Sequence, residues 1–201
     1  MAMHSYSIDS ESRLKVSVVL FTIATAIPGI FTVVVDAAKA KLNLPAWISF
    51  PITSGTLYGF LWWSFDRFLW RAKPELFGVR DLNGKWRACG KSSFVDPATS
   101  QPFEFEMAVT IKQTFTKLEV YTETSDSTSR SSMASLCTDQ AVPTFRYAYD
   151  NTPRNLANSE LQRHPGLIDL RIDSGSKMSG DYFSGKHRLR FGELKLERIA
   201  S

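Results

Sequence analysis

Two stretches of twenty residues, 16–35 and 46–65, contain no Asp, Glu, Lys, Arg or His. The hydrocarbon core of a bilayer is about 30 Å thick, and about 20 helical residues cross it. Because each stretch has this length, the sequence predicts a hairpin of two transmembrane helices over residues 14–73. A cleaved signal peptide, whose apolar core is usually shorter, and two buried helices of a soluble protein are the alternatives.

Basic residues around these stretches predict their orientation. Five Lys and Arg residues flank the outer ends of the two stretches, and two lie in the segment between them. Cytoplasmic flanks carry the excess of positive charge, so residues 1–13 are expected to form a cytoplasmic tail and the polar remainder of the chain to lie on the same side. The two cysteines, Cys89 and Cys137, form no CxxC motif, which agrees with a reducing compartment.

A GxxxG pattern, formed by Gly55 and Gly59, lies in the second stretch. Small residues at this spacing let helices approach closely, because van der Waals contact drives helix association in lipid. The pattern predicts packing between copies of the chain, and a glycine pair that packs loosely is the alternative. Neither stretch contains a charged residue that would mark an ion path.

After Gly78 the hydrophobic pattern changes to a period of two. Residues 103–113 show it clearly, because Phe, Met, Val and Ile alternate there with mostly polar residues. Such alternation is typical of strands with one buried face. Eight strands are expected in the domain 78–201, at or around residues 84–93, 103–113, 116–124, 130–138, 145–150, 168–172, 178–184 and 188–199.

Eight strands with short connections predict a membrane-anchored, all-β fold, an up-and-down antiparallel β-barrel like that of lipocalins. A β-sandwich is the alternative. The interior of an eight-stranded barrel is just wide enough to be filled by side chains or to hold one small ligand.

The meander also predicts where a ligand could enter. If the first strand begins at the membrane, the connections 94–102, 125–129, 151–165 and 185–187 gather at the far end. This mouth is expected to collect basic and amide side chains above two inward-facing tyrosines, Tyr147 and Tyr149. Aromatic faces and arginine forks suit a phosphate-bearing nucleotide, whereas a filled core with a solvated rim is the alternative. The residues expected at the rim are Arg130, Asn151, Arg154, Arg163, His164, His187 and Arg188.

The sequence contains no recognisable catalytic constellation. It has no P-loop, no G-x-S-x-G and no HExxH motif, and its three histidines lack zinc-ligand spacing. The net charge is +4, and +3 of it lies in residues 1–73, around the apolar stretches, which disfavours direct binding of nucleic acid. We therefore expect a binding protein that is not an enzyme and uses neither a metal nor a cofactor.

Several short motifs follow the two apolar stretches in a recognisable order. They are Gly84-Lys85-Trp86, the segment from Tyr147 to Pro153, His164-Pro165-Gly166, the segment from Gly180 to Phe183, and the segment from Gly192 to Leu196. In this order the chain resembles the SMODS-associated two-transmembrane, β-strand-rich effectors of bacterial CBASS anti-phage defence, the CD-NTase-associated protein fifteen family. The resemblance covers nearly the whole chain.

The resemblance implies a sensor of a cyclic dinucleotide messenger in the bacterial inner membrane. Ligand binding to the barrel would assemble the membrane helices into a homo-oligomer and disrupt the bilayer, which kills the cell. A membrane-anchored, lipocalin-like carrier of a small apolar molecule is the alternative, and a purely structural barrel is a third possibility. The residues expected near the ligand are Thr122, Arg130, Tyr147, Tyr149, Asn151 and Arg154.

Overall fold

The computed structural model of the chain describes residues 3–42, 53–154, 163–185 and 190–199. It divides into two compact units. The barrel unit comprises Met1–Ser10 and Lys73–Ser201, and the helical unit comprises Glu11–Ala72.

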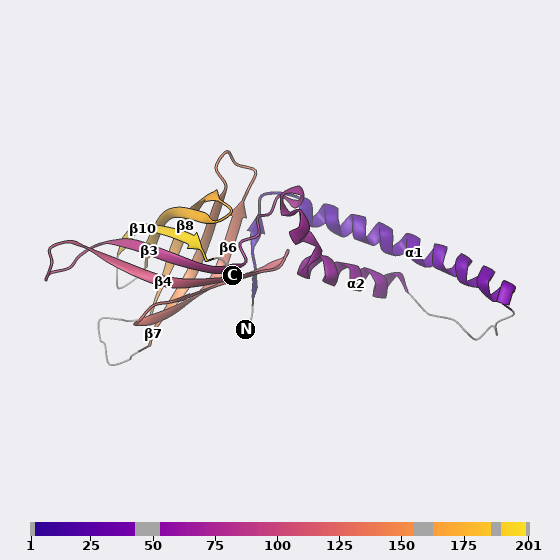
Figure 1. Cartoon of the computed structure of the whole chain (residues 1–201), viewed down its shortest axis with the longest axis horizontal. Coiled ribbons are helices and arrows are strands. Elements are labelled where there is room, and N and C mark those ends of the chain that lie inside the picture. The colour runs from indigo at the N-terminus through magenta and orange to yellow at the C-terminus, as the bar shows by residue number, and fades with distance from the viewer. Residues whose placement is uncertain (1–2, 43–52, 155–162, 186–189, 200–201) are drawn as a thin grey trace. The chain divides into compact units, whose positions relative to one another are not determined.

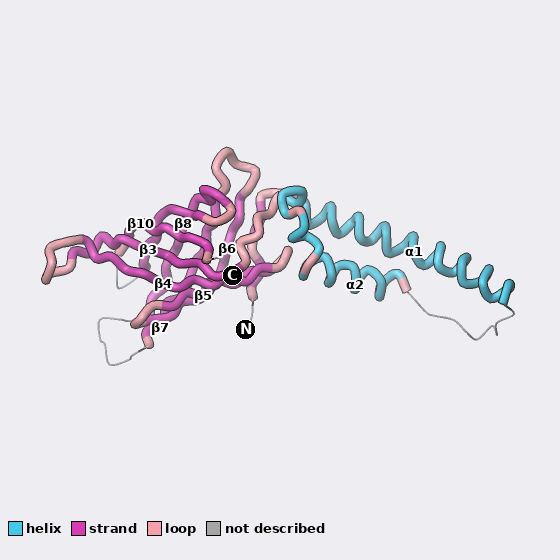
Figure 2. Tube along the Cα trace, in the orientation of Figure 1, coloured by secondary structure: helices cyan, strands magenta, loops and turns pink. Residues whose placement is uncertain are grey.

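Eight antiparallel strands form a closed barrel, as the sequence predicts (Figures 1 and 2). Each strand pairs with the next along the chain, and the last pairs with the first, so the sandwich alternative does not apply. The strands are β3 (Gly84–Val95), β4 (Pro102–Gln113), β5 (Lys117–Glu123), β6 (Ser127–Cys137), β7 (Thr144–Pro153), β8 (His164–Ser174), β9 (Lys177–Ser184) and β10 (Phe191–Arg198).

One end of the barrel is filled by apolar side chains from the alternating positions. Trp86 on β3 is fully buried there, and its indole N–H donates a hydrogen bond to the carbonyl of Leu82 at 3.0 Å. The guanidinium of Arg198 lies 4.9 Å from the centre of the Trp86 ring and donates to the carbonyls of Asp81 and Asn83. The start of β3 and the end of β10 are thereby fixed to the same loop.

Two short strands near the N-terminus complete the wall. β5 and β6 pair only through residues 121–123 and 128–130. Beyond that ladder, β1 (His4–Ser5) pairs with β5 and β2 (Ser7–Ile8) pairs with β6. Tyr6 between them is 2% exposed, and its hydroxyl donates to the carbonyl of Phe115 at 3.1 Å.

The structure therefore differs from the sequence prediction that residues 1–13 form a tail outside the barrel. Residues 4–8 belong to the barrel wall, although the sequence places them outside the barrel domain 78–201. A strand of two residues has no hydrophobic period, so pattern analysis could not detect it.

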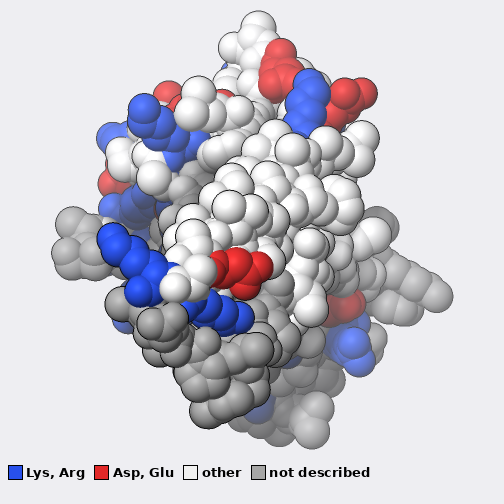
Figure 3. Space-filling view, turned by 90° about the vertical axis from the view of Figure 1, so that its right-hand side faces the viewer, with Lys and Arg blue, Asp and Glu red and all other residues white. Residues whose placement is uncertain are grey.

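The helical unit contains α1 (Ser12–Leu42), α2 (Ser54–Arg67) and the short 3₁₀ helix η1 (Leu69–Ala72). A second 3₁₀ helix, η2 (Pro74–Phe77), lies in the barrel unit before β3. Of the described helices, α1 is long and apolar enough to cross a membrane. Large apolar side chains project from it, and Val33 is 70% exposed. In the view of Figure 3, most of the described residues at the centre are neither acidic nor basic.

α2 has 14 residues, and its first turn is capped by the Thr53 hydroxyl, which accepts from the N–H of Thr56 at 3.2 Å. The start of the predicted second span, residues 46–52, lies outside the described residues. α1 and α2 contact each other through Tyr58, whose hydroxyl is 2.8 Å from that of Ser17 and whose ring meets Phe21 edge-on. The two helices thus form a packed hairpin over their described parts.

Candidate ligand-binding site

A partly open cavity of about 390 Å³ lies at the other end of the barrel. The ends of β3, β5, β7 and β9 and the beginnings of β4, β6 and β8 line it, together with Arg190 just before β10. Strand ends meet at this mouth because the meander reverses there at every second connection. The volume falls within the range of roughly 300–1,000 Å³ that is usual for small-molecule sites.

Aromatic rings and small hydroxyls make up most of the lining. The rings of Phe103 and Phe105 are nearly parallel with centres 6.4 Å apart, and Phe105 meets Tyr182 edge-on at 5.6 Å. The aromatic residues of the lining are Phe94, Phe103, Phe105, Tyr149 and Tyr182, and its hydroxyl residues, besides the two tyrosines, are Ser92, Thr122, Thr124, Ser125, Ser127, Ser129 and Ser184.

Charge is sparse within this lining. Among its described residues, Arg190 is the only Lys or Arg, and its guanidinium carbon lies 3.9 Å from the centre of the Phe94 ring. Glu104 and Glu106 border the cavity, but their carboxylates pair with basic side chains of β3, at 4.0 Å and 3.2 Å respectively. Asp126 is the remaining acidic residue of the described lining.

Asn151 presents a polar group that has no hydrogen-bond partner among the described residues. Its amide N–H donates to the hydroxyl of Ser127 at 3.0 Å, and its amide oxygen is buried with no hydrogen-bond partner among the described residues. A buried acceptor that makes no hydrogen bond costs about 1–3 kcal/mol. A ligand that donates a hydrogen bond to this oxygen would remove that cost.

Three of the six residues expected near the ligand line the cavity, namely Thr122, Tyr149 and Asn151. Tyr147 lies behind the lining, where it is 2% exposed and packs against Phe145 with ring centres 5.3 Å apart. Burial, with a smaller contribution from Tyr149, raises the pKa of the Tyr147 phenol, so this hydroxyl stays neutral.

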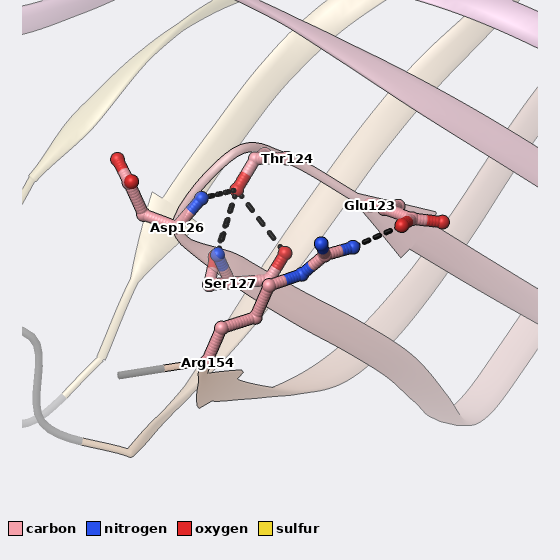
Figure 4. Close-up of polar contacts among 5 residues, drawn as sticks. All are labelled: Glu123, Thr124, Asp126, Ser127 and Arg154. Atoms are coloured by element: carbon pink, nitrogen blue, oxygen red, sulfur yellow. Dashed lines mark hydrogen bonds and ion pairs between the residues drawn. The ribbon is translucent and has the colours of Figure 1, made fainter. Parts of the chain in front are cut away.

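The other two expected residues do not line the cavity. Arg130 pairs with the carboxylate of Glu119, its Nε lying 3.1 Å from Oε1. Arg154 follows β7 and forms an ion pair with Glu123 at the β5–β6 hairpin (Figure 4). Its backbone N–H donates to the carbonyl of Asp126 at 2.8 Å, so the backbone and the guanidinium of Arg154 are both held at the rim.

Sequence reasoning missed most of the aromatic lining. The signal for Phe103 and Phe105 was available, because both lie on the apolar face of a predicted strand that starts at the predicted mouth. Phe94 and Arg190 lie at or beyond strand ends, where the hydrophobic pattern does not predict whether a side chain points into the barrel or outward. Of the other expected rim residues, His164 lines the cavity, Arg163 is exposed, and His187 and Arg188 lie outside the described residues.

Comparison with protein-family models assigns both parts of the chain. Residues 77–198 match the family model "Cap15, cyclic dinucleotide receptor domain", and residues 14–71 match "Cap15, TM helices". The chain belongs to the Cap15 family. A similar curated protein is CD-NTase-associated protein 15 of Yersinia aleksiciae, which is 29% identical over 161 residues, or 78% of this chain and 74% of the relative.

The Cap15 assignment confirms the resemblance to CBASS effectors found in the sequence. The receptor match spans the eight barrel strands, so the cavity at the mouth lies within the cyclic dinucleotide receptor domain. The transmembrane match spans both charge-free stretches, which supports a membrane anchor.

Proposed function

We propose that this protein binds a cyclic dinucleotide in the mouth cavity, and that binding promotes oligomerisation of its membrane helices and disruption of the bacterial inner membrane. The observation that carries the proposal is a cavity lined by aromatic rings and hydroxyls at the mouth of a Cap15 cyclic dinucleotide receptor domain. The protein acts in this proposal through binding alone, without a catalytic step, a cofactor or direct contact with nucleic acid.

The lining offers a complement to each part of such a ligand. Bases can stack on the rings, an interaction worth about 1–3 kcal/mol per base. The Asn151 amide oxygen accepts from a base N–H, and the hydroxyls together with Arg190 donate to the phosphates. An apolar carrier site would leave these donors and the buried Asn151 oxygen without partners.

The β5–β6 ladder offers a route from the cavity to the membrane helices. Thr122 and Ser129 pair across this short ladder and both line the cavity. β2 continues the same wall beside β6 and ends at Ile8, and three residues separate it from Ser12, where α1 begins. A ligand that favours one arrangement of this wall shifts the equilibrium by its difference in affinity for the two arrangements.

The helical unit supports membrane insertion and self-association. α1 exposes apolar side chains along its length, and the TM-helix match covers both stretches. A Cβ added to Gly59 would have no described heavy atom within 4 Å. A Cβ added to Gly55 would lie near only the hydroxyl of Thr53, the residue that caps α2. We infer that this face packs against another copy in a multi-pass arrangement with both termini and the barrel in the cytoplasm.

A leakage assay on the full-length protein tests the proposal. We expect one class of cyclic dinucleotide to release dye from vesicles that contain the protein, over the concentration range in which calorimetry detects binding. Ligand at 100 times its Kd should also stabilise the protein by about 2.7 kcal/mol. The matching linear dinucleotide serves as the control. Binding without leakage would contradict the membrane step, and the absence of binding across the panel would contradict the ligand.

A pair of arginine variants tests which basic residue meets the phosphates. We expect Arg190→Ala to lower the affinity about tenfold, because a hydrogen bond to a charged group contributes roughly 1.5–3 kcal/mol. Arg154→Ala removes the same residue type at the same mouth, but from a side chain paired with Glu123, and should leave the affinity nearly unchanged. Titration calorimetry measures both. The reverse order would place the phosphates at Arg154, as the sequence predicts.

A further inference from the structure

Three of the aromatic rings in the cavity face a glycine on the neighbouring strand. In each case the two residues are direct partners in the sheet register, and both side-chain positions point into the barrel. The pairs are Phe105 with Gly90, Tyr149 with Gly166, and Tyr182 with Gly192.

In two of these pairs the tip of the ring occupies the space that a side chain on the glycine would fill. A Cβ added to Gly90 would lie 2.3 Å from Cζ of Phe105, and one added to Gly166 would lie 2.2 Å from Cζ of Tyr149. Directly opposed Cβ atoms are about 4.5–5.5 Å apart, which is close to the length of an aromatic side chain. Each ring therefore lies along the barrel wall, across the adjacent strand, and does not point toward the barrel axis.

We propose that Gly90 and Gly166 are positioning residues of the ligand site. By leaving space on the wall, they let Phe105 and Tyr149 lie down beside it, which keeps the cavity open and leaves the rings available for stacking with a base. The inference rests on the proposed function for the identity of the ligand. The ring positions and the open volume follow from the protein alone.

Two other glycines in the barrel are needed because the backbone of the neighbouring strand lies close to them. A Cβ on Gly180 would lie 2.0 Å from the carbonyl oxygen of Asp169, and one on Gly192 would lie 2.0 Å from that of Lys91. Alanine at either position would have to move a strand. At Gly90 and Gly166 the nearest atoms belong to the far end of a rotatable side chain, so alanine can be accommodated by turning the ring.

Alanine substitutions in the full-length protein test the inference. We expect Gly166→Ala and Gly90→Ala each to lower the affinity for the cyclic dinucleotide about tenfold or more, because the displaced ring enters the cavity. The melting temperature should change little. Gly175→Ala, in the β8–β9 turn, is the matched control, because a Cβ there meets nothing within 4 Å, and it should bind like the unmodified protein.

A double variant separates ring positioning from a general effect on the fold. If Gly166 acts through the ring of Tyr149, Gly166→Ala should lower the affinity far less once Tyr149 is already alanine. Equal losses in both backgrounds would overturn the inference, and so would full affinity in Gly166→Ala and Gly90→Ala. If these two variants failed to fold, both glycines would be needed for the backbone structure of the barrel, and this result would also overturn the inference.

A ligand-free structure of Gly166→Ala gives an independent result. The Tyr149 ring should be turned toward the barrel axis and the cavity should be smaller. An unmoved ring would contradict the inference whether or not the protein binds a cyclic dinucleotide. Failure of the proposed function is recognised separately, because the unmodified protein would then bind no member of the panel.

Discussion

Tyr149→Ala should lower the affinity for the cyclic dinucleotide by roughly 10- to 100-fold, since stacking of a base on an aromatic ring contributes about 1–3 kcal/mol. Tyr149 is 9% exposed, lines the cavity and lies against Gly166 on the adjacent strand. Its ring is therefore held in place before the ligand arrives, and little rotamer freedom is lost on binding. Calorimetric titration of the full-length protein measures the change.

Two conservative variants show whether the ring itself is responsible. Tyr149→Phe keeps the ring and should keep most of the affinity. Tyr147→Phe removes a hydroxyl that lies behind the lining, and it should also bind normally. If Tyr147→Phe instead lost the ligand, the inner tyrosine would be a contact, as the sequence predicts, and the cavity described above would not be the complete site.

Gln113→Leu should destabilise the barrel by about 3 kcal/mol, because it removes three hydrogen bonds of a buried amide and takes the acceptor from the Leu82 N–H and the donor from the Arg80 carbonyl, each at a cost of about 1–3 kcal/mol. Gln113 ends β4, is 1% exposed and joins three parts of the chain. Its Oε1 accepts from the N–H of Leu82 at 2.9 Å, and its Nε2 donates to the carbonyl of Arg80 and to the hydroxyl of Tyr6, both at 3.1 Å.

The melting temperature of the full-length protein in detergent, followed by circular dichroism, measures this effect. For a barrel of this size we expect it to fall by roughly 10 °C. Gln101→Leu makes the same exchange at an exposed position before β4 and should leave the melting temperature nearly unchanged. Equal melting temperatures for both variants would show that the Gln113 hydrogen bonds contribute little to closing the barrel.

The outcome of the sequence analysis differs between residues for physical reasons. The alternation of its strand predicts that Tyr149 points into the barrel, and this residue lines the cavity. Arg130, which the sequence also predicts near the ligand, lies on a weakly patterned strand, and the partner that holds it, Glu119, lies on a different strand. Arg154 lies just past the end of β7, where the direction of its side chain depends on the ion pair with Glu123. Neither partner can be identified from spacing along the chain.

The sequence by itself determined the two apolar stretches, the eight strands, the end of the barrel at which the cavity lies, and the family resemblance. Those features depend on local periodicity, length and motif order, which are properties of neighbouring residues. Only the tertiary structure decided that residues 4–8 complete the wall beside β5 and β6, and that Phe105 and Tyr149 lie over Gly90 and Gly166. These contacts depend on the register between strands, which is set by the closure of the whole barrel, and no short segment of the chain encodes it alone.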